Sequence, residues 1–298
     1  MLRQNARIAV VAPAGVFVPE RLAYTEAGVR ALGYQPVLAP SVAARHRYLA
    51  GTAAQRAADL AWALTAPDID AVWFARGGYG TAQTLALLPW ESLDSRPVIG
   101  FSDATALLVA MHKRGFRSVH GPVLHGLCEW DLGSHPPVTP IDTESRAVLR
   151  ALLATGVAPA LPGRPLLGDP APVRGPVIGG NLTVLASLAG TPWALDATGA
   201  IVVLEDVHEP VYRIERALCQ LLDSGGLRGA LGVALGDFYH CRPDAADYTL
   251  ADVLREHLGT LGIPVVHGLP VGHSVHNYAW IHGAEGTLAP DGITWTAA

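Results

Sequence analysis

The stretch Arg96–Leu108 reads R-P-V-I-G-F-S-D-A-T-A-L-L and predicts an abrupt junction between a strand and a helix. The apolar residues Pro97–Phe101 fit a buried strand, and a helical apolar pattern follows directly after Ser102 and Asp103. A serine at such a junction presents its hydroxyl beside the free N–H groups of a helix N-terminus, as an activated nucleophile does. The same pattern also fits a serine that only caps the helix.

Strands and helices alternate through the first half of the chain. Buried strands are expected at residues 7–12, 35–39, 70–75, 97–101 and 118–122, and helices at residues 20–32, 53–64 and 81–88. This alternation with short connections predicts a doubly wound parallel sheet. In such a sheet the functional site lies beyond the carboxyl ends of the strands, where both Ser102 and the loop Arg76–Gly80 fall.

The pattern changes after a stretch rich in Pro and Gly. Residues 154–176 contain P-A-L-P-G-R-P, G-D-P-A-P and R-G-P, which is typical of a linker. Beyond it we expect strands at residues 200–205, 231–238, 264–266, 284–288 and 294–296, a helix opened by Gly179-Gly180-Asn181 and a helix at residues 212–222. We therefore predict a first domain of residues 1–153, a linker of residues 154–176, and a mixed α/β second domain of residues 177–298.

Composition indicates a globular protein and argues against several classes of function. Half of the 298 residues are apolar, the net charge is −5 and Lys113 is the only lysine, so no nucleic-acid partner is expected. No apolar run approaches the roughly 18 residues that a membrane span needs, and the short N-terminal run fits a strand better than a signal peptide. Three scattered cysteines without a C-x-x-C pair favour a reducing, cytoplasmic location.

Candidate partners for Ser102 occur in the second half of the chain. Glu205 ends the apolar strand I-V-V-L-E, and His273 lies in P-V-G-H-S-V-H-N, just after another expected strand. A serine attacks once a neutral imidazole takes its proton, and an acid fixes the imidazole tautomer and stabilises its cation. A solvated loop acid and a structural histidine are the alternative interpretations, which these residues alone leave open.

The loop Arg76–Gly80 reads R-G-G-Y-G and can bring N–H groups close to an oxyanion, because glycine has no side chain. The N–H groups of Gly78 and Asp103 are the candidate donors. A tight turn or a phosphate cradle is the alternative, although the chain has neither G-x-G-x-x-G nor a Walker sequence.

A metal site is the other rival interpretation. His120 with His125, and His273 with His276, have spacings that a metal could use. There is no H-E-x-x-H motif and no evident carboxylate framework, so we expect neither a metal nor a cofactor.

A series of short motifs runs in order along nearly the whole chain. They are V-A-P-A-G at Val11–Gly15, R-G-G-Y-G at Arg76–Gly80, G-F-S-D-A-T-A-L at Gly100–Leu107, H-G-P at His120–Pro122, I-G-G-N-L at Ile178–Leu182, L-E-D at Leu204–Asp206, Y-R-I-E-R at Tyr212–Arg216 and G-H at Gly272–His273. With these motifs the chain resembles the L,D-carboxypeptidases, serine peptidases that trim muropeptides, and their relatives the microcin C immunity peptidases.

The resemblance implies Ser102 as nucleophile, His273 as general base and then acid, and Glu205 as the residue that orients His273. It implies an oxyanion hole from the N–H groups of Gly78 and Asp103. It further implies a Rossmann-like N-terminal domain of the class I glutamine amidotransferase type, a smaller, β-rich C-terminal domain, a site between the two, and a homodimer.

The implied reaction is removal of a terminal D-alanine from muropeptide tetrapeptides during peptidoglycan recycling, with no cofactor. Ser102 attacks the carbonyl of an L-configured centre, in meso-diaminopimelate or L-lysine, and water then hydrolyses the acyl-enzyme. The substrate's free carboxylate needs a cation or N–H donors, for which Arg76 and Arg213 are candidates, although either could serve a structural ion pair instead.

Two alternatives remain open at this point. The microcin immunity branch hydrolyses aminoacyl-nucleotide toxins and needs an aromatic surface, which Trp130 and Trp193 could offer if they are not core residues. A small-molecule binding protein with a vestigial triad is the second alternative, and it predicts no reaction with serine-directed acylating reagents.

Overall fold

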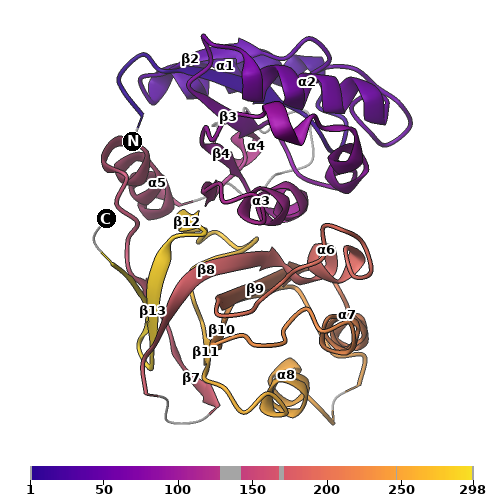
Figure 1. The fold of residues 1–298 in the computed structure, drawn as a ribbon, viewed down its shortest axis with the longest axis vertical. Helices are drawn as coiled ribbons and strands as arrows, with labels where there is room; N and C mark the ends of the chain where they lie inside the picture. Colours follow the sequence, from indigo (N-terminus) through magenta and orange to yellow (C-terminus); the bar gives the residue numbers. More distant parts are fainter. Residues whose placement is uncertain (1, 128–141, 168–170, 246, 297–298) are drawn as a thin grey trace.

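The computed structural model describes residues 2–127, 142–167, 171–245 and 247–296, which form two sheets, one above the other in Figure 1. The first sheet has the order β12-β5-β4-β3-β1-β2. Its strands are β1 (Arg7–Val11), β2 (Gln35–Leu38), β3 (Ala71–Phe74), β4 (Val98–Gly100), β5 (Ser118–His120) and β12 (Trp280–His282). Strands β1 to β5 run parallel, as predicted, and β12 is antiparallel to β5.

Helices cover the first sheet and share its hydrophobic core. They are α1 (Leu22–Ala31), α2 (Ala53–Thr65), α3 (Thr105–His112), α4 (Leu124–Leu127) and α5 (Thr143–Thr155), with short 3-10 segments η1 (Pro19–Arg21), η2 (Thr81–Leu87), η3 (Trp90–Ser92) and η4 (Ser102–Ala104). A capping box fixes the start of α2, since Thr52 and Gln55 satisfy each other's backbone N–H groups.

The helix expected at residues 81–88 is the 3-10 segment η2. The Thr84 hydroxyl donates to the Thr81 carbonyl at 2.7 Å, and the N–H of Thr81 donates to the Asp103 carboxylate. Side-chain bonds of this kind compete with the α-helical ladder, which explains why the apolar pattern misled the prediction.

The second sheet is mixed and has the order β6-β14-β13-β8-β9-β10-β11-β7. Its strands are β6 (Leu161–Pro162), β7 (Arg164–Leu167), β8 (Val173–Asn181), β9 (Ile201–Val207), β10 (Gly232–Tyr239), β11 (Val265–His267), β13 (Glu285–Ala289) and β14 (Gly292–Trp295). Strands β8 to β11 are parallel, and their neighbours on both sides are antiparallel. Helices α6 (Leu182–Ser187), α7 (Val211–Asp223) and α8 (Leu250–Gly259) lie together on one side of this sheet (Figure 1).

The segment interpreted as a linker, residues 154–176, contains β6, β7 and the start of β8. Strands β6 and β7 form the two edges of the second sheet. Proline is tolerated in edge strands because no ladder N–H is needed on the open side, so Pro162 and Pro165 do not prevent pairing. A count of prolines therefore could not separate a linker from edge strands.

The two sheets meet where α3 faces the end of β8 (Figure 1). The N–H of Asn181 donates to the Thr105 hydroxyl at 3.1 Å, and the N–H of Gly179 donates to His282 Nε2 at 3.1 Å. Gly180 has φ +137°, and a Cβ at this position would lie 2.5 Å from Thr105 Oγ1. The I-G-G-N motif therefore provides the close approach that joins the sheets.

We expect Gly180→Ala to lower the free energy of unfolding by about 3 kcal/mol, because it adds both backbone strain and a clash with Thr105. Gly190→Ala is the matched control, since Gly190 also has positive φ but has open space around it. Urea denaturation should show a loss of only about 1 kcal/mol for this control. Equal losses in both variants would contradict the proposed packing at Gly180.

Candidate active site

Ser102 stands at the carboxyl end of β4, in a backbone conformation that few non-glycine residues adopt. Its φ is +61°, between the extended Phe101 and the helical residues that lead into α3. Gly100 permits this tight turn, because a Cβ there would lie 2.8 Å from the Ala104 Cβ. A serine with positive φ at a strand-to-helix turn is typical of exposed nucleophiles. The abrupt junction predicted from the sequence is thus present.

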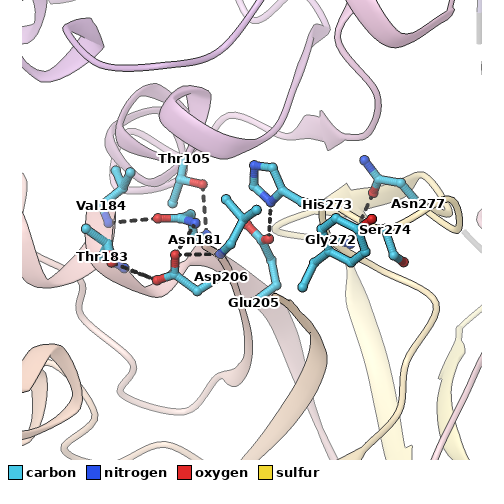
Figure 2. A network of polar contacts seen from close by, with 12 residues as sticks. Thr105, Asn181, Thr183, Val184, Glu205, Asp206, Gly272, His273, Ser274 and Asn277 are labelled. Atoms are coloured by element: carbon cyan, nitrogen blue, oxygen red, sulfur yellow. Dashed lines mark hydrogen bonds and ion pairs between the residues drawn. The ribbon is translucent and has the colours of Figure 1, made fainter. Parts of the chain in front are cut away.

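A carboxylate and an imidazole are paired at the end of the second sheet. Glu205 in β9 is fully buried, and its Oε2 lies 2.6 Å from His273 Nδ1 (Figure 2). Gly272, with φ +135°, precedes the histidine, and a Cβ there would lie 3.3 Å from the same carboxylate oxygen. The G-H motif thus allows the loop to approach Glu205. The Phe101 ring, 4.7 Å from the His273 ring between centroids, packs against the imidazole.

The buried pair changes the acidity of the histidine. Burial alone would lower the pKa of His273, but the Glu205 carboxylate, assisted by Asp206 and Asp237, outweighs this effect and raises that pKa above its ordinary value. With Nδ1–H donating to Glu205, the Nε2 atom is left to accept a proton. This is the arrangement of a general base whose cation is stabilised by a carboxylate.

Ser102 and His273 line one cavity of about 440 Å³, together with residues from the R-G-G loop. The loop lies directly on the serine, since a Cβ on Gly77 would be 3.0 Å from Ser102 Oγ. Gly78 also lines the cavity and has φ +113°. The two candidate oxyanion donors, the N–H groups of Gly78 and Asp103, are therefore on the two segments that meet at Ser102.

The side chain of Asp103 is buried and has a positioning role. Its Oδ2 accepts from the N–H and the hydroxyl of Thr81, at 2.8 and 2.6 Å. Burial raises the pKa of Asp103, while the bonds from Thr81 and the charge of Arg56 act in the opposite direction. These contacts fasten the segment after the R-G-G-Y-G loop to the serine turn.

Arg56 is a second positioning residue, which the sequence analysis did not single out. It is buried in α2 and donates to the Pro13 and Gly80 carbonyls at 2.6 and 2.7 Å. The loops after β1 and β3 are thereby held together. Arg56 lies among the alanines and leucines of an apolar helix, and this position was the only sequence signal available.

Asp206 fixes the strand end that carries Glu205. Its carboxylate accepts from the N–H and hydroxyl of Thr183, both at 2.8 Å, and from the Asn181 amide at 3.2 Å (Figure 2). Asn181 also caps α6 by accepting from the N–H of Val184 at 3.0 Å. Asp206 therefore holds the end of β9 in place.

The two candidate arginines lie in different places. Arg76 lines the Ser102 cavity, and its guanidinium donates to the Val16 carbonyl at 2.8 Å. Arg213 on α7 is exposed, pairs with Glu209 at 3.5 Å and lines a separate hollow beside Tyr212. The structure thus brings Arg76, but not Arg213, to the serine.

Of the four candidate metal-binding histidines, His125 and His273 line the Ser102 cavity, whereas the other two and Trp193 do not. Trp193 packs against Trp90, with ring centroids 4.9 Å apart, and Trp130 lies outside the described residues, as does Cys128. His120 is buried and stacked on Trp280, and His276 bonds to Asp142. In the described part of the chain, no group of three or more His, Cys, Asp or Glu side chains could hold a metal ion. The described helices also include none long and apolar enough to cross a membrane.

Both halves of the chain match models of one peptidase family. Residues 8–121 match the LD-carboxypeptidase N-terminal domain, and residues 174–288 match the LD-carboxypeptidase C-terminal domain. The first match contains Ser102, and the second contains Glu205 and His273.

Curated proteins and solved structures match most of the chain, and carboxypeptidases are among them. The murein tetrapeptide carboxypeptidase of Pseudomonas aeruginosa is 41% identical over 98% of this chain and 95% of its own length. The solved muramoyltetrapeptide carboxypeptidase from Oxalobacter formigenes has a TM-score of 0.83 at 29% identity, covering 98% of this chain and all of that one. The microcin C7 self-immunity protein MccF of Escherichia coli is 27% identical over 76% of this chain and 73% of its own length.

We expect Glu205→Gln to lower the pKa of His273, because burial is then opposed only by the weaker influence of Asp206 and Asp237. Glu209→Gln is the control, since Glu209 pairs with Arg213 instead and should leave this pKa in place. Histidine NMR titration measures both. A His273 pKa that is unchanged in Glu205→Gln would rule out the proposed charge coupling.

Proposed function

The chain belongs to the LD-carboxypeptidase family and is a serine-type carboxypeptidase, and we propose that it releases the terminal D-alanine of muropeptide tetrapeptides through a Ser102–His273–Glu205 triad. One observation carries this proposal: the left-handed Ser102 and the Glu205-bonded His273 line the same cavity. The names of the relatives support the substrate class.

In the proposed reaction, His273 Nε2 takes the proton of the Ser102 hydroxyl as its oxygen attacks the carbonyl of the L-configured residue. The negative charge that develops on the carbonyl oxygen is stabilised by the N–H groups of Gly78 and Asp103. The imidazolium, held by Glu205, then protonates the departing amine of D-alanine. Water, activated by the same imidazole, hydrolyses the acyl-enzyme and releases the shortened peptide.

We assign the free carboxylate of the terminal D-alanine to Arg76. Among the described residues, it is the arginine that lines the cavity. Arg21 lies close enough to add positive charge, since burial, assisted by the charges of Arg21 and Arg76, lowers the pKa of His125 to about 3. Arg213 is not assigned this role, because it lines a separate hollow. A peptidase that acts only at a chain end needs such a cationic subsite.

The proposal extends to the biological setting that the resemblance implies. In this setting the carboxypeptidase serves peptidoglycan recycling, works in the cytoplasm and assembles as a homodimer. The domain division of residues 1–153 and 177–298 remains part of the proposal, with the amendment that β12 belongs to the first sheet and β6 and β7 to the second.

Ser102→Ala should reduce release of D-alanine from a meso-diaminopimelate tetrapeptide by at least about 10⁴-fold, because no acyl-enzyme can form. Ser102→Gly suits the positive φ of this position and should be equally inactive, which separates chemistry from backbone strain. Mass spectrometry of the peptide detects the loss of one alanine. Near-wild-type release by either variant would refute the serine mechanism. No release by the wild type would favour an aminoacyl-nucleotide substrate instead.

Arg76→Ala should raise KM about tenfold while lowering kcat less, because a subsite for the substrate's carboxylate contributes mainly to binding. Arg213→Ala is the matched control and should keep KM within about twofold. Steady-state kinetics on the same tetrapeptide measures both variants. A KM that rises for Arg213→Ala and not for Arg76→Ala would reverse the assignment.

A further inference from the structure

Two histidines end neighbouring strands in the same unusual conformation as Ser102. His208 follows β9 with φ +56°, and His240 follows β10 with φ +57°. Strands β9 and β10 are parallel neighbours, so both turns lie at the carboxyl ends of these strands, on the same side of the second sheet's ladder. Non-glycine residues persist in this region only where surrounding contacts fix them, and such positions concentrate at functional sites.

These turns form an aromatic cluster at the catalytic cavity. His208 and Tyr239 line the cavity that contains Ser102 and His273. The rings of His208 and His240 are stacked at 5.3 Å between centroids, and the Tyr239 ring lies 4.1 Å from that of His240. His240 itself is outside the cavity lining. Its ring therefore backs the two rings that can touch a substrate.

Backbone contacts hold the cluster in place. The N–H of His208 donates to the Tyr239 carbonyl at 2.9 Å, and the N–H of Val211 donates to the Arg242 carbonyl at 3.1 Å. The two turns are thus tied to each other by two backbone hydrogen bonds. A side chain on such a doubly fixed turn keeps its direction, as a specificity determinant must.

The polar atoms of this cluster are suited to an anion. His208 offers a ring N–H and Tyr239 a hydroxyl, and the Arg242 guanidinium lies 3.4 Å from His240 Nδ1. Three of the nearby acids are already engaged. Glu209 pairs with Arg213, and Glu205 holds His273, while Asp206 is bonded to Thr183 and Asn181.

We propose that His208, supported by Tyr239 and backed by His240, binds a second carboxylate of the substrate. This carboxylate lies at the far end of a side chain, that of the residue whose carbonyl Ser102 attacks. The inference rests on the proposed function, since it assigns the substrate's second anion within the same site. Arg76 approaches the cavity from the first sheet, whereas His208 and Tyr239 approach it from the second. Meso-diaminopimelate carries this second carboxylate and lysine does not, so the enzyme prefers the diaminopimelate tetrapeptide.

The test compares two tetrapeptides that differ only in meso-diaminopimelate or L-lysine at the third position. The measured quantity is the ratio of their kcat/KM values. His208→Gly removes the ring and suits the positive φ, so the turn is retained. We expect it to lower the ratio on the order of tenfold, as loss of a hydrogen bond to a charged group does.

Asn5→Gly is the matched control, because Asn5 has nearly the same backbone φ, +59°, and lies outside both the cavity and the aromatic cluster. It should change the ratio by no more than about twofold, and circular dichroism should show both variants folded. A ratio unchanged in His208→Gly, or lowered equally in both variants, overturns this inference while the proposed function stands. Failure of the wild type to release alanine from either peptide overturns both.

Discussion

The site depends on a carboxylate kept in a fully buried position by one imidazole. Glu205 has no solvent exposure, its Oε2 contacts His273, and its Oε1 has no hydrogen-bond partner among the described residues. A buried carboxylate is costly unless a positive charge or donors compensate for lost hydration. The pair is therefore most favourable when His273 is protonated, which is the state that the proposed attack of Ser102 on a carbonyl requires. The burial of the Glu205 carboxylate, which is costly by itself, also favours the protonated His273 that a hydrolase of this type needs.

The path of the chain explains how this pair reaches the serine. Ser102 belongs to the first sheet and Glu205 to the second. The segment that carries His273 leaves β11 of the second sheet and enters β12 of the first, so it is anchored on both. The contact of Gly180 with Thr105 sets the separation of the two sheets. Residues carried by the two sheets thereby line one cavity.

Much of this arrangement could be predicted from residues, and the failures have physical reasons. Buried parallel strands are continuous apolar runs, so β1, β3 and β9 were located to within a residue or two. Edge strands bear prolines and lack such runs, so β6 and β7 resembled a linker, and the three-residue β12 gave no pattern. The candidate triad followed from strand ends and motif order. Arg56, whose partners are backbone carbonyls distant in sequence, could not be found in that way.

The central claim is that Ser102 is a nucleophile activated by His273, and covalent labelling tests it most directly. The protein would be treated with a fluorophosphonate, which phosphonylates activated serines with loss of fluoride, and the adduct would be mapped by peptide mass spectrometry. The account predicts one adduct per chain, on Ser102, formed much more slowly in Glu205→Gln. Absence of an adduct, or an adduct on another serine, would contradict it and would favour a binding protein with a vestigial triad.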